Sequence, residues 1–290
     1  MAEIQLAFSS FGISANTFLL LSHVFTLAFT HRVKPIDMTV SHLSLIHILL
    51  LFTKATLVSS DLFGSQNVQS NLGCKVAVFL SKVLRGLSIS TTCLPSVLQA
   101  VTISPSSSSL AKFKHISPNH ALGFFLFSWV LNMSISSNLL FYTAAAPSGT
   151  EAGLLFVTKH CSFLPVSNMH RSMFSTLVTL RDVTFLGSMV LSSGYMVTIL
   201  YRHERLSQHL HSTGFSPRVS PAKRASQTVL LLVSCFVFVY WVDFTFSFSV
   251  VVTWMNDPLL ATVSALLLIT ADKKITRVFQ NMLREISFSV

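Results

Sequence analysis

Long apolar stretches separated by short polar joints make up most of the 290-residue chain. Seven such stretches can be marked, and all but the last come near the roughly 20 residues that a membrane-spanning helix needs. Membrane-spanning β-strands would be shorter and would alternate apolar and polar residues. The pattern predicts an all-α membrane protein, one seven-transmembrane helix bundle over residues 1–290 without an internal repeat. The predicted spans are residues 6–30, 38–58, 75–101, 121–142, 183–201, 228–251 and 254–271.

The composition also indicates a membrane protein. Hydrophobic residues make up 51% of the chain and charged residues only 10%, against roughly 25% charged residues in soluble domains. The formal charge of +10 is compatible with nucleic-acid binding or with basic cytoplasmic loops, so its location matters. Basic loops stay in the cytoplasm, which places the N-terminus outside and the C-terminus inside and argues against a nucleic-acid partner. Thirteen of the twenty basic residues lie in alternate joints, at residues 31–37, 104–120, 202–227 and after Asp272.

The tail after the last apolar stretch predicts a short amphipathic helix over residues 273–286. Its apolar residues recur at helical spacing, and four basic residues fill other positions of the helix. A helix of this kind lies along the membrane surface with its apolar side in the lipid. The expected fold is therefore seven spans followed by a surface helix on the inner leaflet.

Two of the four cysteines fall where a disulfide is expected. Cys74 begins the third apolar stretch on the outside, and Cys161 lies in the long second outer loop. Both positions would face an oxidising compartment, where a bridge between the loop and the helix can form. The alternative is two free thiols. Cys93 and Cys235 lie inside spans, where cysteine packs as a small apolar residue.

Several charged residues lie inside the predicted spans, where charges are costly and tend to face the interior of a bundle. At 1.5 Å per helical residue they converge on one depth in the outer half of the membrane; Arg85, for example, lies about 16 Å below the outer face. Arg85 suits an acidic or sulfated ligand group. The alternative is an ion pair of Asp243 with Arg85 or Lys54 that only holds helices together. With two nearby aromatic residues, the candidate ligand pocket comprises Lys54, Lys82, Arg85, Tyr240, Trp241 and Asp243.

The remaining chemistry-bearing residues form no recognisable site. His203, His209 and His211 share one inner loop, but their spacing matches no compact zinc site, so no metal and no cofactor is expected. No motif of a nucleophilic, metal-dependent or phosphate-binding enzyme occurs, so no catalytic activity is expected. His23 and His47 lie in spans and are expected to hydrogen-bond within the bundle.

The most distinctive segment begins in the third predicted span, where residues 84–118 read LRGLSISTTCLPSVLQAVTISPSSSSLAKFKHISP. Residues 12–16 read GISAN, and residues 42–51 read HLSLIHILLL. Together with residues 194–213 and 226–244, these segments resemble the vomeronasal type-1 receptors, a family of pheromone receptors coupled to G proteins. The resemblance covers nearly the whole chain.

The resemblance implies a receptor in the plasma membrane of vomeronasal neurons. It would bind a small chemosignal within the helical bundle and activate an inhibitory-type heterotrimeric G protein through a population shift. Residues 102–105, Thr-Ile-Ser-Pro, stand where most rhodopsin-like receptors carry Asp-Arg-Tyr, as this family would have it. The residues expected to face the G protein are Thr102, Ser104, Pro105, Lys112, Lys114, Arg202 and Arg205.

The chain departs from this family in its seventh span. Residues 258–271, between Asp257 and Asp272, would reach about 21 Å as a helix against a hydrocarbon core of about 30 Å. Ala265 also stands where the family usually has proline. These departures suggest, as an alternative, a degenerate family member that does not signal. A transporter or channel is the alternative of another class, although no inverted repeat or broken helix is evident.

Glycosylation is a second point of departure. Relatives often carry a sequon in the second outer loop, but Asn168-Met169-His170 is not one. The only sequon is Asn132-Met133-Ser134, which lies within the predicted fourth span. An unglycosylated chain is therefore expected.

Overall fold

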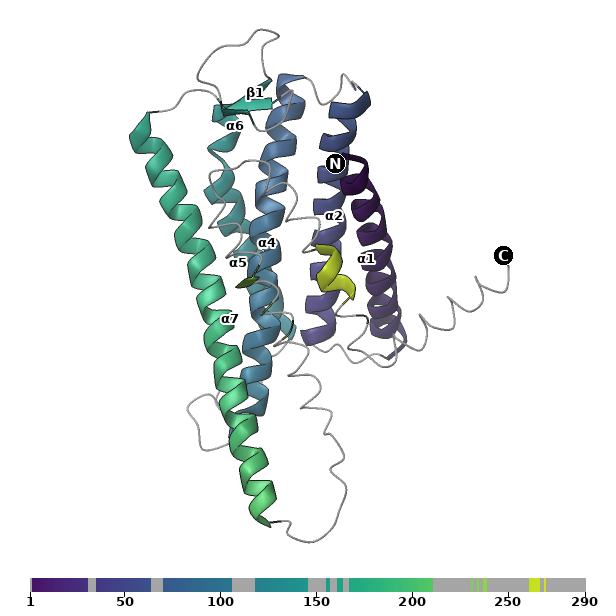
Figure 1. Ribbon diagram of the computed structural model, residues 1–290, viewed down its shortest axis with the longest axis vertical. Helices are drawn as coiled ribbons and strands as arrows, with labels where there is room; N and C mark the ends of the chain where they lie inside the picture. Colours follow the sequence, from purple (N-terminus) through teal and green to yellow (C-terminus); the bar gives the residue numbers. More distant parts are fainter. Residues whose placement is uncertain are drawn as a thin grey trace, which may run out of the picture.

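A computed structural model describes the chain over residues 2–30, 35–63, 70–105, 118–145, 155–156, 161–163, 167–210 and 261–266, with Leu231, Ser234, Val237, Phe238 and Ile269. Most of these residues are helical, and the long helices stand side by side as a bundle (Figure 1). A small β-sheet lies at one end of the bundle, which we call the sheet end. The opposite end is called the far end.

The first helices follow the predicted apolar stretches but extend beyond them. α1 spans Ala2–Thr30 and α2 spans Pro35–Phe63, where residues 6–30 and 38–58 were predicted. Proline opens α2 because the first helical position needs no N–H partner. Asp37 in the first turn adds a negative charge at the positive end of the helix dipole.

The central helix, α4, spans Asn71–Ile103, two to four residues longer at each end than the predicted span of residues 75–101. Ser70 caps its first turn, since its hydroxyl accepts a hydrogen bond of 3.0 Å from the N–H of Gly73. At the other end Ser104 adopts a ψ of 138° and leaves the helical conformation. The following Pro105 disfavours helix in the preceding residue, so the chain itself specifies this end.

The predicted fourth and fifth spans differ from the observed helices. α5 (Pro118–Ser136) and α6 (Leu139–Tyr142) cover the predicted 121–142 with a break between them. α7 runs over Asn168–Leu210 and extends beyond the predicted fifth span of residues 183–201 at both ends. Arg181 and Asp182 directly precede the predicted span, and charged residues are uncommon within membrane-spanning helices. In the structure the two charges pair with each other, and the helix carries both.

The prediction of a purely helical protein missed a small sheet. β1 (Thr143–Ala145), β2 (Leu155–Phe156) and β3 (Cys161–Phe163) form an antiparallel sheet in the order β1-β3-β2. Strands of two or three residues are too short to show an alternating pattern in the sequence. The disulfide between Cys74 and Cys161 is present and joins the middle strand to the first turn of α4.

α4 lies at the centre of the bundle and packs against α2, α5, α7 and β1. One apolar cluster joins α2 to α4 and is formed by Ile46, Leu50, Val83, Leu84 and Leu87. A second cluster joins α4 to α7 and is formed by Cys93, Ala100, Met189 and Met196. Helix packing through buried apolar faces thus fixes the position of α4, which carries many of the candidate functional residues.

Four stretches of the described helices are long and apolar enough to cross a membrane: Gln5–Thr26, Pro35–Ser59, His120–Tyr142 and Ser172–Ile199. Their outward side chains are large and apolar, and Leu191, for example, is 76% exposed. An apolar outer surface of this extent suits lipid rather than water. The predicted sixth span and the predicted tail helix at residues 273–286 lie largely or wholly outside the described residues. Within the predicted seventh span, residues 261–266 are helical.

Candidate functional site

Lys54 and Arg85, two residues of the predicted pocket, are near in sequence to residues of the apolar cluster that joins α2 to α4. Lys54 lies on α2, is 4% exposed, and follows Leu50 of that cluster by one turn. Arg85 follows the buried Leu84 on α4 and is half-buried. Lys82 lies on an exposed side of the same helix. Outside the described residues lie the other predicted members, Tyr240, Trp241 and Asp243.

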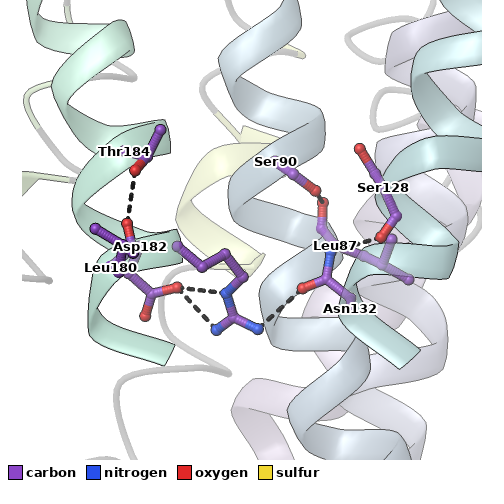
Figure 2. A network of polar contacts seen from close by, with 8 residues as sticks. Leu87, Ser90, Ser128, Asn132, Leu180, Asp182 and Thr184 are labelled. Atoms are coloured by element: carbon purple, nitrogen blue, oxygen red, sulfur yellow. Dashed lines mark hydrogen bonds and ion pairs between the residues drawn. The ribbon is translucent and has the colours of Figure 1, made fainter. Parts of the chain in front are cut away.

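Arg181 is a buried charge, although its place in the sequence indicates a joint on the outer side. It lies on α7 and is only 8% exposed. Its Nε donates to Oδ1 of Asp182 at 2.8 Å, and its Nη2 lies 2.8 Å from the same oxygen. Its Nη1 donates to Oδ1 of Asn132 on α5 at 2.9 Å. Figure 2 shows the guanidinium between these two side chains, so one cation links α5 to α7.

Gly86 on α4 leaves the space that this link occupies. A Cβ at Gly86 would overlap Oδ1 of Asn132 and would lie 2.5 Å from Nη1 of Arg181. Asn132 is itself fully buried, and its Nδ2 donates to the carbonyl of Ser128 at 2.7 Å (Figure 2). We call Gly86, Asn132, Arg181 and Asp182 the arginine site. It places a paired cation and anion at the junction of α4, α5 and α7, where an unpaired charge would be strongly unfavourable.

The burial of Asn132 bears on glycosylation, because it belongs to the only sequon of the chain. We expect glycosidase treatment to leave the electrophoretic mobility of the expressed chain unchanged. As a control, Ser148→Asn completes the sequon Asn-Gly-Thr in the predicted second outer loop and should produce a shift that glycosidase removes. A shift in the unaltered chain would contradict the prediction, and no shift in the control would contradict the predicted outside position of that loop.

Five of the residues expected to face a G protein lie at the far end of α4 and α7. Thr102, Pro105 and Arg202 are exposed there. Ser104 is only 1% exposed, and its Oγ lies 2.9 Å from Oη of Tyr195, a hydrogen bond that ties the end of α4 to α7. Nothing in the sequence pattern around Tyr195 indicates this contact. Arg205 belongs to α7, and outside the described residues lie Lys112 and Lys114.

The fold and these sites define a class: a multi-pass helical membrane protein with charged and polar groups buried between its helices. The sequence profile of the vomeronasal organ pheromone receptor family matches residues 2–281. The chain therefore belongs to the vomeronasal pheromone receptor family, as the sequence motifs predicted.

Individual relatives agree with this assignment. Human vomeronasal type-1 receptor 5 is 50% identical over 298 aligned positions, which cover 94% of this chain and 78% of the relative. Rat vomeronasal type-1 receptor 90 is 41% identical, with 94% of this chain and 91% of the relative covered. A human vomeronasal receptor-like protein 4 is 68% identical over 187 residues, covering 64% of this chain and 90% of the relative. The names of these relatives describe receptors rather than enzymes.

Proposed function

We propose that this chain is a pheromone receptor of the plasma membrane with seven spans, an outside N-terminus and a cytoplasmic C-terminus. It binds a small chemosignal between its helices and activates an inhibitory-type heterotrimeric G protein. The observation that carries the proposal is membership of the pheromone receptor family over residues 2–281. The ligand would enter from the sheet end, and the G protein would bind at the far end, where Thr102, Pro105 and Arg202 are exposed.

The buried charges on α2 and α4 support a polar binding site within the bundle. Lys54 is almost fully buried and Arg85 half-buried, although both lie in helices of a membrane protein. Charges in such places mark functional sites because their burial is costly. A guanidinium recognises carboxylate and sulfate groups through paired hydrogen bonds, so Arg85 is the residue that would select an acidic or sulfated ligand.

The experiment measures inhibition of cAMP formation in cells that express the chain, against a panel of carboxylated, sulfated and neutral small molecules. We expect Arg85→Ala to weaken the response to an acidic ligand about tenfold or more, the value of one lost charged hydrogen bond. Arg85→Lys keeps the charge and should lose less. Lys75→Ala is the matched control, since Lys75 is a basic residue near the start of the same helix, outside the candidate pocket.

Surface levels must be measured in parallel, by an epitope tag at the N-terminus. A response that survives Arg85→Ala at equal surface level would contradict the role of Arg85. No response to any ligand at normal surface level would contradict the receptor function and would favour the degenerate, non-signalling alternative.

A further inference from the structure

His47 lies at a buried polar junction of four segments of the chain. It belongs to α2, and its ring contacts Asn16 of α1, Ser88 of α4 and Ser264 of the segment 261–266. All four residues are at most 4% exposed. We call them the His47 junction. Unlike His23, whose Nδ1 faces Asp37 at 3.3 Å, His47 has neutral hydrogen-bonding partners at both ring nitrogens.

The hydrogen-bonding pattern around His47 determines which ring nitrogen carries the proton. The Nδ2 group of Asn16 donates to the carbonyls of Gly12 at 2.8 Å and Ala261 at 3.2 Å, so its Oδ1 faces the histidine as an acceptor. The hydroxyl of Ser264 donates to the carbonyl of Ala261 at 3.1 Å, which leaves its oxygen as an acceptor too. Nδ1 must therefore be the donor. Nε2 then accepts the hydroxyl of Ser88 at 2.8 Å, and a neutral ring satisfies every group.

One N–H group is thus shared between two helical segments. Nδ1 of His47 lies 3.3 Å from Oδ1 of Asn16 and 3.3 Å from Oγ of Ser264. A single proton cannot point fully at both oxygens, so it holds α1 and the segment 261–266 against α2 through one three-centre bond. Replacing His47 with an apolar residue would therefore weaken both contacts at once.

The segment 261–266 also fits closely against α1. Thr262 donates to the carbonyl of Phe8 at 3.4 Å, and a Cβ at Gly12 would overlap Oγ1 of Thr262. Next to these polar contacts Ala265 packs with Ala15 and Leu19 of α1, in a cluster completed by Ile269. The surface that contacts this segment therefore consists of a glycine, a small apolar cluster and the His47 junction.

We infer that His47 is the positioning residue that docks the predicted seventh helix, through an Nδ1–H group shared between Asn16 and Ser264. The sequence predicts a short seventh span, and such a span would gain less from lipid and more from contacts within the protein, so these contacts are important for it. The inference goes beyond the proposed function and does not depend on any ligand or G protein.

The test measures how fast a cysteine in the segment is alkylated in the full chain in membranes. Ala265→Cys, in a background with Cys93→Ser and Cys235→Ser, places the thiol at a fully buried position. We expect His47→Leu to increase the alkylation rate by a membrane-permeant maleimide about fivefold or more. His47→Asn keeps an N–H donor near the position of Nδ1 and should restore most of the protection. Adding Ser264→Ala to His47→Leu should give no further increase, because both remove the same bond.

His42→Leu is the matched control. His42 lies on the same helix, accepts from Nε1 of Trp129 at 3.1 Å and faces Thr91 at 3.3 Å, so it joins α2 to α4 and α5 instead. Its variant should leave the alkylation rate at Ala265→Cys unchanged. Equal rates in His47→Leu and the parent, a rise as large in His42→Leu, or no rescue by His47→Asn would each overturn the inference. Thermal denaturation of the detergent-solubilised variants, without the added cysteine, separates local undocking from global unfolding.

Discussion

Replacing Gly86 with valine is expected to remove most of the receptor from the cell surface. Any β-carbon at this position overlaps Oδ1 of Asn132 and crowds Nη1 of Arg181. To make room, the side chains of Asn132 and Arg181 must both shift, which breaks the hydrogen bond between them and displaces the buried guanidinium from Asp182. A lost hydrogen bond to a charged group costs about 1.5–3 kcal/mol, and a broken buried ion pair costs about 3–5 kcal/mol. Either is a large fraction of a typical stability of about 5–15 kcal/mol.

Surface staining of an N-terminal tag and thermal denaturation in detergent measure this effect. Gly187→Val is the matched control, because Gly187 lies on α7 and a Cβ there meets nothing within 4 Å. It should keep near-normal surface levels. Replacing both Arg181 and Asp182 with leucine removes the buried pair altogether and should be milder than Arg181→Leu alone, which leaves Asp182 unpaired. Normal stability of Gly86→Val, or an equal loss in Gly187→Val, would contradict the role of the arginine site.

The contacts of the arginine site could not be predicted from the sequence. A run of apolar residues shows where a helix lies, but a charge at its edge does not reveal whether the helix ends or the charge is paired. By sequence alone Arg181 and Asp182 resemble part of a joint, although neighbouring opposite charges can compensate each other inside a bundle. The partner on α5, Asn132, lies 49 positions away, and only the folded chain brings it to Arg181.

Features set by local chemistry were easier to predict. The apolar stretches predicted where α1, α2, α4, α5 and α7 lie. The positions of Cys74 and Cys161 predicted their disulfide. Ser104 shows the limit: its position at the end of α4 follows from Pro105, but its bond to Tyr195 depends on how α7 packs. Polar residues within spans can be recognised from the sequence as candidates, whereas their partners are set by tertiary packing.

Removing the disulfide between Cys74 and Cys161 is expected to lower surface level and stability about as much as Gly86→Val does. The bridge closes a separation of 87 residues, and Cys74 and Cys161 are both fully buried. Closing a loop of this length lowers the conformational entropy of the unfolded chain by an amount worth about 4–5 kcal/mol. Without the bridge, β3 loses its covalent link to α4, and the sheet is held only by strands of two or three residues and by the packing of β1 against α4. We therefore expect Cys74→Ser with Cys161→Ser to lower both surface level and thermal stability strongly.

Surface staining and thermal denaturation of single and double variants separate the bridge from the thiols. Each single variant leaves a reactive thiol on the partner cysteine, so the double variant measures the loss of the bridge alone. Its surface level and stability should be no lower than those of either single variant, because all three lack the same bond. Cys93→Ser is the control: Cys93 is buried between α4 and α7 beside Ser188, at 3.2 Å between Sγ and Oγ, and takes no part in a bridge. It should have a small effect, since serine keeps a polar contact to Ser188. A double variant with normal surface level and stability would mean that the helices alone hold the sheet end in place, and a loss as large in Cys93→Ser would show that the chain tolerates no cysteine replacement.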